Sequence, residues 1–499
     1  MQRKQLTLVI VSLLVVVLSV SLAYFTAQII GKGKDVSVTS ANLQIVFTDS
    51  DGALTETDIE PGWTKTKTFT IKNDTKIEYK YNIVIKDLLN TFVTNGYLKY
   101  KITSTNNGYN MTEFKDIPKS SAPKDTILAY SVVIPNGVTQ SYTIEFKYAN
   151  DESVDQSDDM GKKLSGTLFI TEETEDPNKT LYNQLLVDKS KVLTRTDFSK
   201  VLIDNNTNTL YTSTEDSKTV YYFAGNATDN WVKFGKNASN QDLYWRIIRT
   251  NSDGSVRLLY HGTSTTATDA YIGESAFNNS SYTNIAYVSY MYGSTGSIAN
   301  ARTNQKNSST IKDKIDNWYK INLEAKGYTK YLSTTAVYCN DRTYAVSGDT
   351  YFGAYTRLIT NKTPSYDCAT TEDKFTVDTS TGNGKLTYPI ALMTADEVSF
   401  AGGRYGTNAP TWYYYNSANG SSTESNAWWL LSSRNWNGGD AIVFFVYGSS
   451  EQPGNLSNSR VDGTYGVRPA LSLKSCVKYA SGDGSASDPY TIKETTNGC

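Results

Sequence analysis

The segment from Ala427 to Lys474 reads AWWLLSSRNWNGGDAIVFFVYGSSEQPGNLSNSRVDGTYGVRPALSLK. It opens on an apolar run, 428–431, and a second apolar run, 441–447, has the length of a buried strand. Its last part, 467–473, places an apolar residue at every second position, which is the period of a strand. These runs predict a rigid apolar frame with polar residues held between its parts.

The polar residues of this segment are mostly small, and a few aromatic residues stand among them. Such a mixture is typical of protein surfaces that bind a partner through adaptable hydrogen bonds and aromatic anchors. The candidate ligand-binding residues are Arg434, Asn435, Trp436, Asn437, Asp440, Tyr447, Ser449, Glu451, Asn455, Asn458, Asp462 and Tyr465. The alternative is a set of ordinary solvated loops between the last strands of a β-rich domain.

Several short motifs occur in a fixed order along the second half of the chain. They include Tyr221-Tyr222-Phe223, Trp245-Arg246-Ile247-Ile248-Arg249, Cys339-Asn340-Asp341-Arg342 and Gly466-Val467-Arg468-Pro469-Ala470-Leu471. This part resembles an uncharacterised bacterial surface-protein domain of the C-type-lectin-like fold, in its formylglycine-generating-enzyme variant. The resemblance implies an α+β domain at 216–476, after a connection at 175–215 and before a tail at 477–499.

The N-terminus predicts export. Arg3 and Lys4 precede the apolar run 6–25, which is long enough to span a bilayer as a helix. Residues 1–35 are therefore either a retained transmembrane anchor or a signal peptide, for which Ser21-Leu22-Ala23 fits a cleavage site. We expect a cell membrane protein with an extracellular ectodomain, or a secreted protein if the signal is cleaved.

Residues 36–174 alternate apolar and polar positions in about seven short stretches, which predicts an all-β, immunoglobulin-like sandwich. Glu60-Pro61-Gly62 and the run 68–73, TFTIKN, resemble the camelysin and TasA-like exported β-proteins, and imply a stalk or fibre module. The acidic stretch 151–159 is expected to be a solvated loop, with a calcium site as the alternative.

A charged, proline-bearing linker is expected at 172–179. Helical patterning then predicts helices at 181–187, 198–203, 311–323 and 394–400. The last of these begins with Thr394 and carries Glu397 three residues later, which together form a capping box.

Four cysteines in an exported chain predict two disulfides, for which three pairings exist. We favour Cys339 with Cys368, and Cys476 with Cys499.

The sequence offers little material for catalysis. His261 is the one histidine, and it follows an apolar strand as structural residues do. Formylglycine-generating enzymes work through cysteines near the end of their fold, and no such cysteine pair precedes Gly466 here. We therefore expect that the chain is not an enzyme; an orphan enzyme on this fold is the alternative.

We expect no cofactor, and the alternative is a calcium ion in a lectin-like sugar-binding site. Residues 436–440, WNGGD, and 451–454, EQPG, resemble the two sugar-binding motifs of calcium-dependent lectins, but in reversed order and with a different spacing. Sugar binding without metal would use aromatic platforms, for which the candidates are Trp412, Tyr413, Tyr414, Trp436 and Tyr447.

The expected function is recognition or adhesion at the cell surface, by a C-type-lectin-like head on a sandwich stalk. Its partners would be the membrane, through the N-terminal helix, and an extracellular protein or glycan. Near-neutral charge, with 48 basic and 50 acidic residues, indicates no nucleic-acid binding. A fibre or biofilm-matrix subunit is the alternative from a different class.

Overall fold

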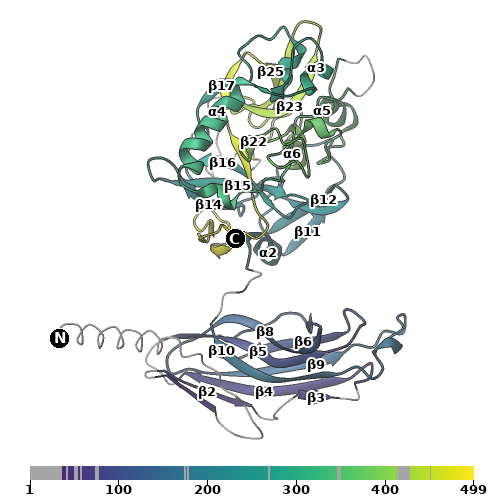
Figure 1. Cartoon of the computed structure of the whole chain (residues 1–499), viewed down its shortest axis with the longest axis vertical. Coiled ribbons are helices and arrows are strands. Elements are labelled where there is room, and N and C mark those ends of the chain that lie inside the picture. The colour runs from purple at the N-terminus through teal and green to yellow at the C-terminus, as the bar shows by residue number, and fades with distance from the viewer. Residues whose placement is uncertain are drawn as a thin grey trace, which may run out of the picture. The chain divides into compact units, whose positions relative to one another are not determined.

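The computed structural model describes residues 36–40, 43–49, 54–56, 59–73, 78–173, 176, 179–267, 270–344, 350–411, 413, 427–449 and 451–499. Contacts divide the chain into Met1–Pro177, which we call the N-terminal domain, and Asn178–Cys499, which we call the head (Figure 1). The division falls inside the segment 172–179. No helix among the described residues is long and apolar enough to cross a bilayer. The predicted anchor at 6–25 lies outside the described residues.

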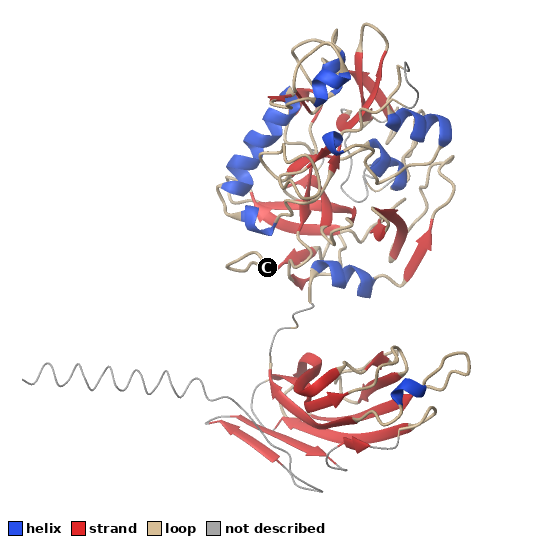
Figure 2. Cartoon of the chain, turned by 45° about the vertical axis from the view of Figure 1, so that its right-hand side comes forward, coloured by secondary structure: helices blue, strands red, loops and turns tan. Residues whose placement is uncertain are grey.

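The N-terminal domain consists of two antiparallel sheets, which Figure 2 shows in red. One sheet has the order β1-β2-β4-β9-β6-β7, and the other has the order β3-β10-β5-β8. The strands are β1 (Val36–Ser40), β2 (Leu43–Asp49), β3 (Leu54–Glu56), β4 (Thr64–Asn73), β5 (Tyr79–Asn90), β6 (Leu98–Ser104), β7 (Lys115–Asp116), β8 (Ser120–Ile134), β9 (Thr139–Tyr148) and β10 (Leu164–Glu172). The prediction of a β-rich domain is confirmed, and the described residues contain more strands than the seven expected.

Alternation of side chains explains the core of this domain. In β9, every second residue from Gln140 to Tyr148 is buried, because successive side chains of a strand point to opposite faces. Tyr100 and Ile102 of β6 and Ile83 of β5 lie in the same core, which both sheets therefore share. Burying apolar faces of two sheets against each other is the main source of stability of such a domain.

The acidic stretch is not wholly a solvated loop, which corrects the prediction for Asp159. This side chain is 5% exposed. Its carboxylate accepts hydrogen bonds from the backbone N–H groups of Val93 and Thr94, at 2.5 and 3.2 Å, and from the Tyr148 hydroxyl at 2.8 Å. Burial alone would raise the pKa of Asp159, but these hydrogen bonds bring it below its ordinary value.

Asp159→Asn is expected to destabilise the N-terminal domain by about 1 to 3 kcal/mol, since a charged acceptor of three hydrogen bonds is lost. Because the folded pKa is depressed, the contribution of Asp159 is present above the unfolded pKa and is lost as the pH falls through the folded pKa. Urea unfolding of the full chain at pH 7 and at pH 3 measures this. An equal difference between wild type and variant at both pH values would contradict it.

The head contains two larger sheets. The first runs β11-β12-β13-β15-β14-β29-β28, and β16, β27 and β22 continue it from β15. Its strands are β11 (Lys191–Thr194), β12 (Thr209–Glu215), β13 (Lys218–Tyr222), β14 (Trp231–Lys236), β15 (Asp242–Thr250), β16 (Val256–Gly262), β22 (Ile390–Leu392), β27 (Pro469–Leu473), β28 (Tyr479–Ser481) and β29 (Tyr490–Ile492). The second sheet has the order β17-β26-β23-β24-β25, with β17 (Glu274–Ala276), β23 (Trp428–Trp436), β24 (Ala441–Val446), β25 (Leu456–Arg460) and β26 (Thr464–Gly466).

The segment 427–474 supplies four of the five strands of the second sheet and the strand β27 of the first. Its apolar runs are buried as expected: Trp428, Trp429, Leu430 and Leu431 are at most 1% exposed. The indole of Trp429 also donates a hydrogen bond to the Ser275 carbonyl of β17, at 2.9 Å. This packing fixes the ends of the polar stretches between the strands.

Short helices surround these sheets, and the mixture of helices and strands gives the head an α+β character (Figure 2). They are α2 (Leu181–Asp188), α3 (Ile298–Arg302), α4 (Thr310–Tyr319), α5 (Gly353–Tyr355) and α6 (Ala395–Phe400); the π-helical turns η3 (Lys320–Glu324) and η5 (Thr356–Asn361) continue α4 and α5, and η2 (Ile285–Val288) is a 3-10 turn. The capping box at the start of α6 is confirmed, with both of its hydrogen bonds present.

The helix predicted at 198–203 is wrong, because these residues have no regular structure. The Arg195 guanidinium links the segment 198–203 to α6. It donates hydrogen bonds to the carbonyl oxygens of Lys200, at 2.7 Å, and Ser399, at 2.9 Å. Phe198 packs edge-on against Phe400. Tertiary contacts therefore replace the local hydrogen bonds that a helix would need.

Both favoured disulfides are present, and their prediction is confirmed. Cys339 pairs with Cys368, and Cys476 pairs with Cys499. The second bond ties the end of the chain to the turn after β27, so that β28 and β29 lie in a closed loop.

Candidate functional site

The predicted site residues lie along one sheet but differ in accessibility. Asn437 and Glu451 are exposed, while Arg434, Trp436, Asp440, Ser449, Asn458 and Asp462 are half-buried. Asn435 and Asn455 are only 4% and 7% exposed, so a ligand at the surface would have little access to their side chains, and their role in binding stays a prediction. Asn435 accepts a hydrogen bond from Arg434, and Asn455 donates one to Asn408. Both amides serve the structure of the sheet.

Some of the aromatic residues predicted as sugar platforms or as ligand-binding residues pack against other rings. Tyr447 lies edge-on to Phe445 with ring centroids 4.7 Å apart, and Tyr465 lies 5.0 Å from both Phe445 and Trp429. Tyr413 is fully buried. Trp412 and Tyr414 lie outside the described residues.

Arg434 is the centre of a surface that three tyrosines surround, which we call the tyrosine–arginine surface: Tyr351, Tyr355, Tyr405, Arg434 and Asn458. The guanidinium carbon lies 5.8, 5.0 and 5.5 Å from the three ring centroids, in that order. These distances suit cation–π attraction, which is worth about 0.5 to 2 kcal/mol for a well-placed ring.

Hydrogen bonds and stacking fix the geometry of this surface. The Tyr405 hydroxyl accepts from Asn458 at 2.7 Å and from Arg434 at 3.3 Å. Tyr351 and Tyr355 stack with their centroids 3.8 Å apart. Burial raises the pKa of Tyr355, and Tyr351 raises it further, while the charge of Arg434 acts in the opposite direction. These side chains are held in place before any partner arrives.

The charge of Arg434 is not compensated by a carboxylate among the described residues. Its Nε–H is buried and has no hydrogen-bond partner in the described part of the chain. A half-buried guanidinium beside three half-buried rings can donate a hydrogen bond to an anionic or carbonyl oxygen of a bound molecule.

Sequence reasoning found Arg434 and Asn458 but missed Tyr351, Tyr355 and Tyr405. These tyrosines come from two segments remote from β23 in the chain: 351–355 and 405. Thirty-seven tyrosines in the chain give no local signal that marks these three.

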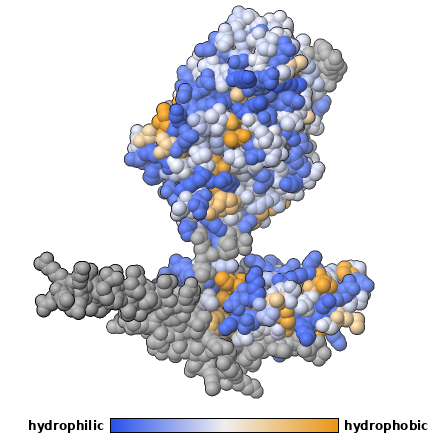
Figure 3. All heavy atoms as spheres, in the orientation of Figure 1, coloured by the Kyte–Doolittle hydropathy of each residue, from blue (hydrophilic) through white to orange (hydrophobic). Residues whose placement is uncertain are grey.

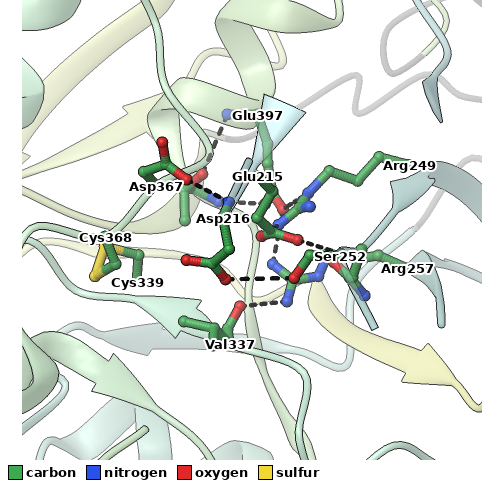
Figure 4. A network of polar contacts seen from close by, with 12 residues as sticks. Glu215, Asp216, Arg249, Ser252, Arg257, Val337, Cys339, Asp367, Cys368 and Glu397 are labelled. Carbon is green, nitrogen blue, oxygen red and sulfur yellow. Dashed lines mark hydrogen bonds and ion pairs between the residues drawn. A yellow bond between two sulfur atoms is a disulfide. The ribbon is translucent and has the colours of Figure 1, made fainter. Parts of the chain in front are cut away.

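A second cluster lies inside the head, around Glu397 at the start of α6 (Figure 4). The Glu397 carboxylate forms ion pairs with Arg249 at 2.9 Å and with Arg257 at 2.7 Å. Arg249 also forms an ion pair with Glu215 at 2.8 Å. These four side chains have side-chain exposures between 1% and 7%. Burial alone would raise the pKa of Glu397, but Arg257 and Arg249 lower it.

Arg357 extends this buried ionic cluster. It contacts Asp396 at 2.9 Å and Asp341 at 2.6 Å. The cavity between these groups, which Cys339 also lines, has a volume of about 10 Å³, and this is room for about one water molecule. A cavity of this size does not admit an organic substrate, so we assign the cluster a structural role.

The described residues contain no group of three or more His, Cys, Asp or Glu side chains that would hold a metal ion. Asn437 and Asp440 of the lectin-like motif bond to each other in the β23–β24 turn. The Asn437 side-chain oxygen accepts from the backbone N–H groups of Gly439 and Asp440, at 3.1 and 2.7 Å. Asp462 pairs with Arg460 at 3.3 Å.

Comparisons with known proteins do not assign a family. No protein-family model matches the chain, and no curated protein matches it. A solved structure described as "AvmM Catalyzes Macrocyclization in Alchivemycin A Biosynthesis" is similar at 11% identity, covering 29% of this chain and 98% of its own, with a TM-score of 0.16. At this score the likeness carries no argument about fold or activity.

Proposed function

We propose that the chain is a cell-surface recognition or adhesion protein, whose head binds an extracellular protein through the tyrosine–arginine surface. In this proposal the head has a C-type-lectin-like fold and the N-terminal domain is an immunoglobulin-like stalk. The observation that carries the proposal is Arg434, which lies among three tyrosine rings without a carboxylate partner in the described part of the chain.

The residue types support a protein partner. Tyrosine and arginine are enriched at the energetic centres of protein interfaces, because they combine a large contact area with hydrogen bonding. Asn458 and the Tyr405 hydroxyl add polar groups at the edge of this surface. Figure 3 shows mainly hydrophilic residues on the face of the head that it presents, as expected for a displayed domain.

The compartment also supports the proposal. Two disulfides suit an oxidising, extracellular environment. The apolar run 6–25 would act as an export signal and, if it is retained, as a membrane anchor. The division of the chain at Pro177 leaves the head as a unit with its own core, as a displayed domain requires.

The prediction that tests this function uses Arg434→Gln and Tyr355→Ala. Each variant is expected to weaken binding of the extracellular protein partner at least tenfold, or about 1.4 kcal/mol. The measurement is an array of extracellular proteins probed with the full chain, followed by titration of each protein that binds.

Tyr244→Ala is the matched control, because Tyr244 is a half-buried tyrosine on β15 in the other sheet. It is expected to leave the affinity unchanged. Equal affinity of wild type, Arg434→Gln and Tyr355→Ala would place the binding site elsewhere. Thermal unfolding of each variant checks that the head is folded.

A further inference from the structure

A cleft of about 450 Å³ lies beside the end of β23. Its lining comes from four segments: 283–285, 296–299, Tyr344 and Trp436. Binding clefts for small molecules commonly have volumes of roughly 300 to 1,000 Å³, so this cleft has room for one or two sugar rings. We propose that it binds a neutral carbohydrate, without a metal ion.

The aromatic residues of the cleft suit the apolar face of a pyranose ring. Trp436 and Tyr344 are both half-buried and both line the cleft. Tyr344 is held by stacking on the buried Phe352, with centroids 5.2 Å apart. The backbone N–H of Trp436 donates to the Thr350 carbonyl at 2.8 Å, which fixes the end of the strand. Rigid rings lose little entropy when a ligand stacks on them.

The remaining lining mixes polar and apolar residues, and those that the structure describes are uncharged. It consists of Thr283, Asn284, Ile285, Gly296, Ser297, Ile298 and Ala299, and none of the described side chains that line the cleft carries a charge. Hydroxyl, amide and backbone groups can bond the hydroxyls of a sugar, whereas an acidic sugar or a phosphate would find no cation among the described lining residues. The lining therefore favours a neutral carbohydrate over an anionic one.

Asn284 makes the cleft rigid. Its side-chain oxygen accepts from the backbone N–H of Ala286 at 3.0 Å and of Gly296 at 3.2 Å, which joins two of the lining segments. Ser297 caps α3 by accepting from the backbone N–H of Asn300 at 3.1 Å. Trp436 is half-buried, and its indole N–H is a donor that suits a sugar hydroxyl.

This inference goes beyond the proposed function, because the cleft and the tyrosine–arginine surface share no residue. The cleft would add a sugar contact to a protein contact on the same strand, β23. Two weak contacts at fixed spacing give a higher total affinity than either alone.

The experiment is an array of neutral and acidic oligosaccharides probed with the full chain in EDTA. We expect binding to neutral oligosaccharides, a loss of at least tenfold in Trp436→Ala, and partial recovery in Trp436→Phe. Ala299→Arg fills the cleft from α3 without changing either ring, and is expected to abolish binding. Arg434→Gln is the control that keeps the cleft.

Three results would overturn the inference: no binding of neutral oligosaccharides at millimolar concentration, binding that needs calcium, or binding that Trp436→Ala and Ala299→Arg leave unchanged. Failure of the proposed protein-binding function is distinguished from failure of this inference. It would appear as unchanged protein binding in Arg434→Gln, whatever the result with oligosaccharides. Intrinsic tryptophan fluorescence on titration with a neutral oligosaccharide gives a second readout, in which Trp436→Phe is expected to lose the change.

Discussion

Glu397→Gln is expected to destabilise the head by about 3 to 5 kcal/mol, the cost of removing one partner from a buried ion pair. The substitution keeps the shape of the side chain but leaves Arg249 and Arg257 without the charge that both of them contact. The charge of Arg257 depends more on Glu397 than that of Arg249 does. Arg257 forms its ion pair in the cluster with Glu397, whereas Arg249 also forms one with Glu215. Urea unfolding, followed by the fluorescence of the buried tryptophans of the head, measures the change.

The effect should depend on pH in one direction. The folded pKa of Glu397 is depressed, so its stabilising contribution is present above the unfolded pKa and is lost as the pH falls through the folded pKa. The difference between wild type and Glu397→Gln is therefore expected to be largest near neutral pH and to shrink in acid.

Asp242→Asn is the matched control, because it breaks an ion pair with Lys236 whose side chains are 36% and 46% exposed. Exposed pairs contribute about 0 to 1 kcal/mol, so this variant should unfold almost as wild type does. If Glu397→Gln were as stable as Asp242→Asn at neutral pH, the buried ionic cluster would not hold the head together.

Replacing both Cys339 and Cys368 by alanine is expected to destabilise the head by about 3 to 4 kcal/mol. The bond joins positions 29 residues apart, and opening it returns the conformational freedom of this loop to the unfolded chain. It also removes Cys339 from the lining of the cavity beside Arg357 and Asp341. Guanidinium unfolding of wild type and double variant measures the loss.

Reducing agent supplies the control for the disulfide. Reduction should destabilise wild type more than the double variant, because only wild type has this bond to lose. The Cys476–Cys499 bond is present in both and contributes equally. Unfolding of the double variant at the same guanidinium concentration as wild type would contradict the expected role of the bond.

Local patterns were sufficient to predict the apolar strands and the capping box, and the two favoured disulfides are present, whereas β25 and β26 lie in the polar part of the segment. The apolar runs of 427–474 became β23, β24 and β27, because the apolar pattern that marks a buried strand is local in the sequence. Thr394 and Glu397 are three residues apart, so their capping box is visible in the sequence. The helix predicted at 198–203 failed where Arg195 and Phe400 supply contacts that no local pattern contains.

The site was only partly predictable. Asn435 and Asn455 have the composition of a binding loop, but the register of β23 and the turn before β25 place their side chains inside. Glu397 meets Arg249 and Arg257 across 148 and 140 residues, and the tyrosines that surround Arg434 come from other segments. Such contacts between remote residues depend on the tertiary fold, and they cannot be predicted from a single sequence.

Photo-cross-linking tests the central claim most directly. The full chain would carry p-azidophenylalanine in place of Tyr355 or, as a control, in place of Tyr244, and would be irradiated with the extracellular protein that binds on the array. We predict a cross-link from position 355 and none from position 244. A cross-link from position 244 alone would show that recognition does not use the tyrosine–arginine surface.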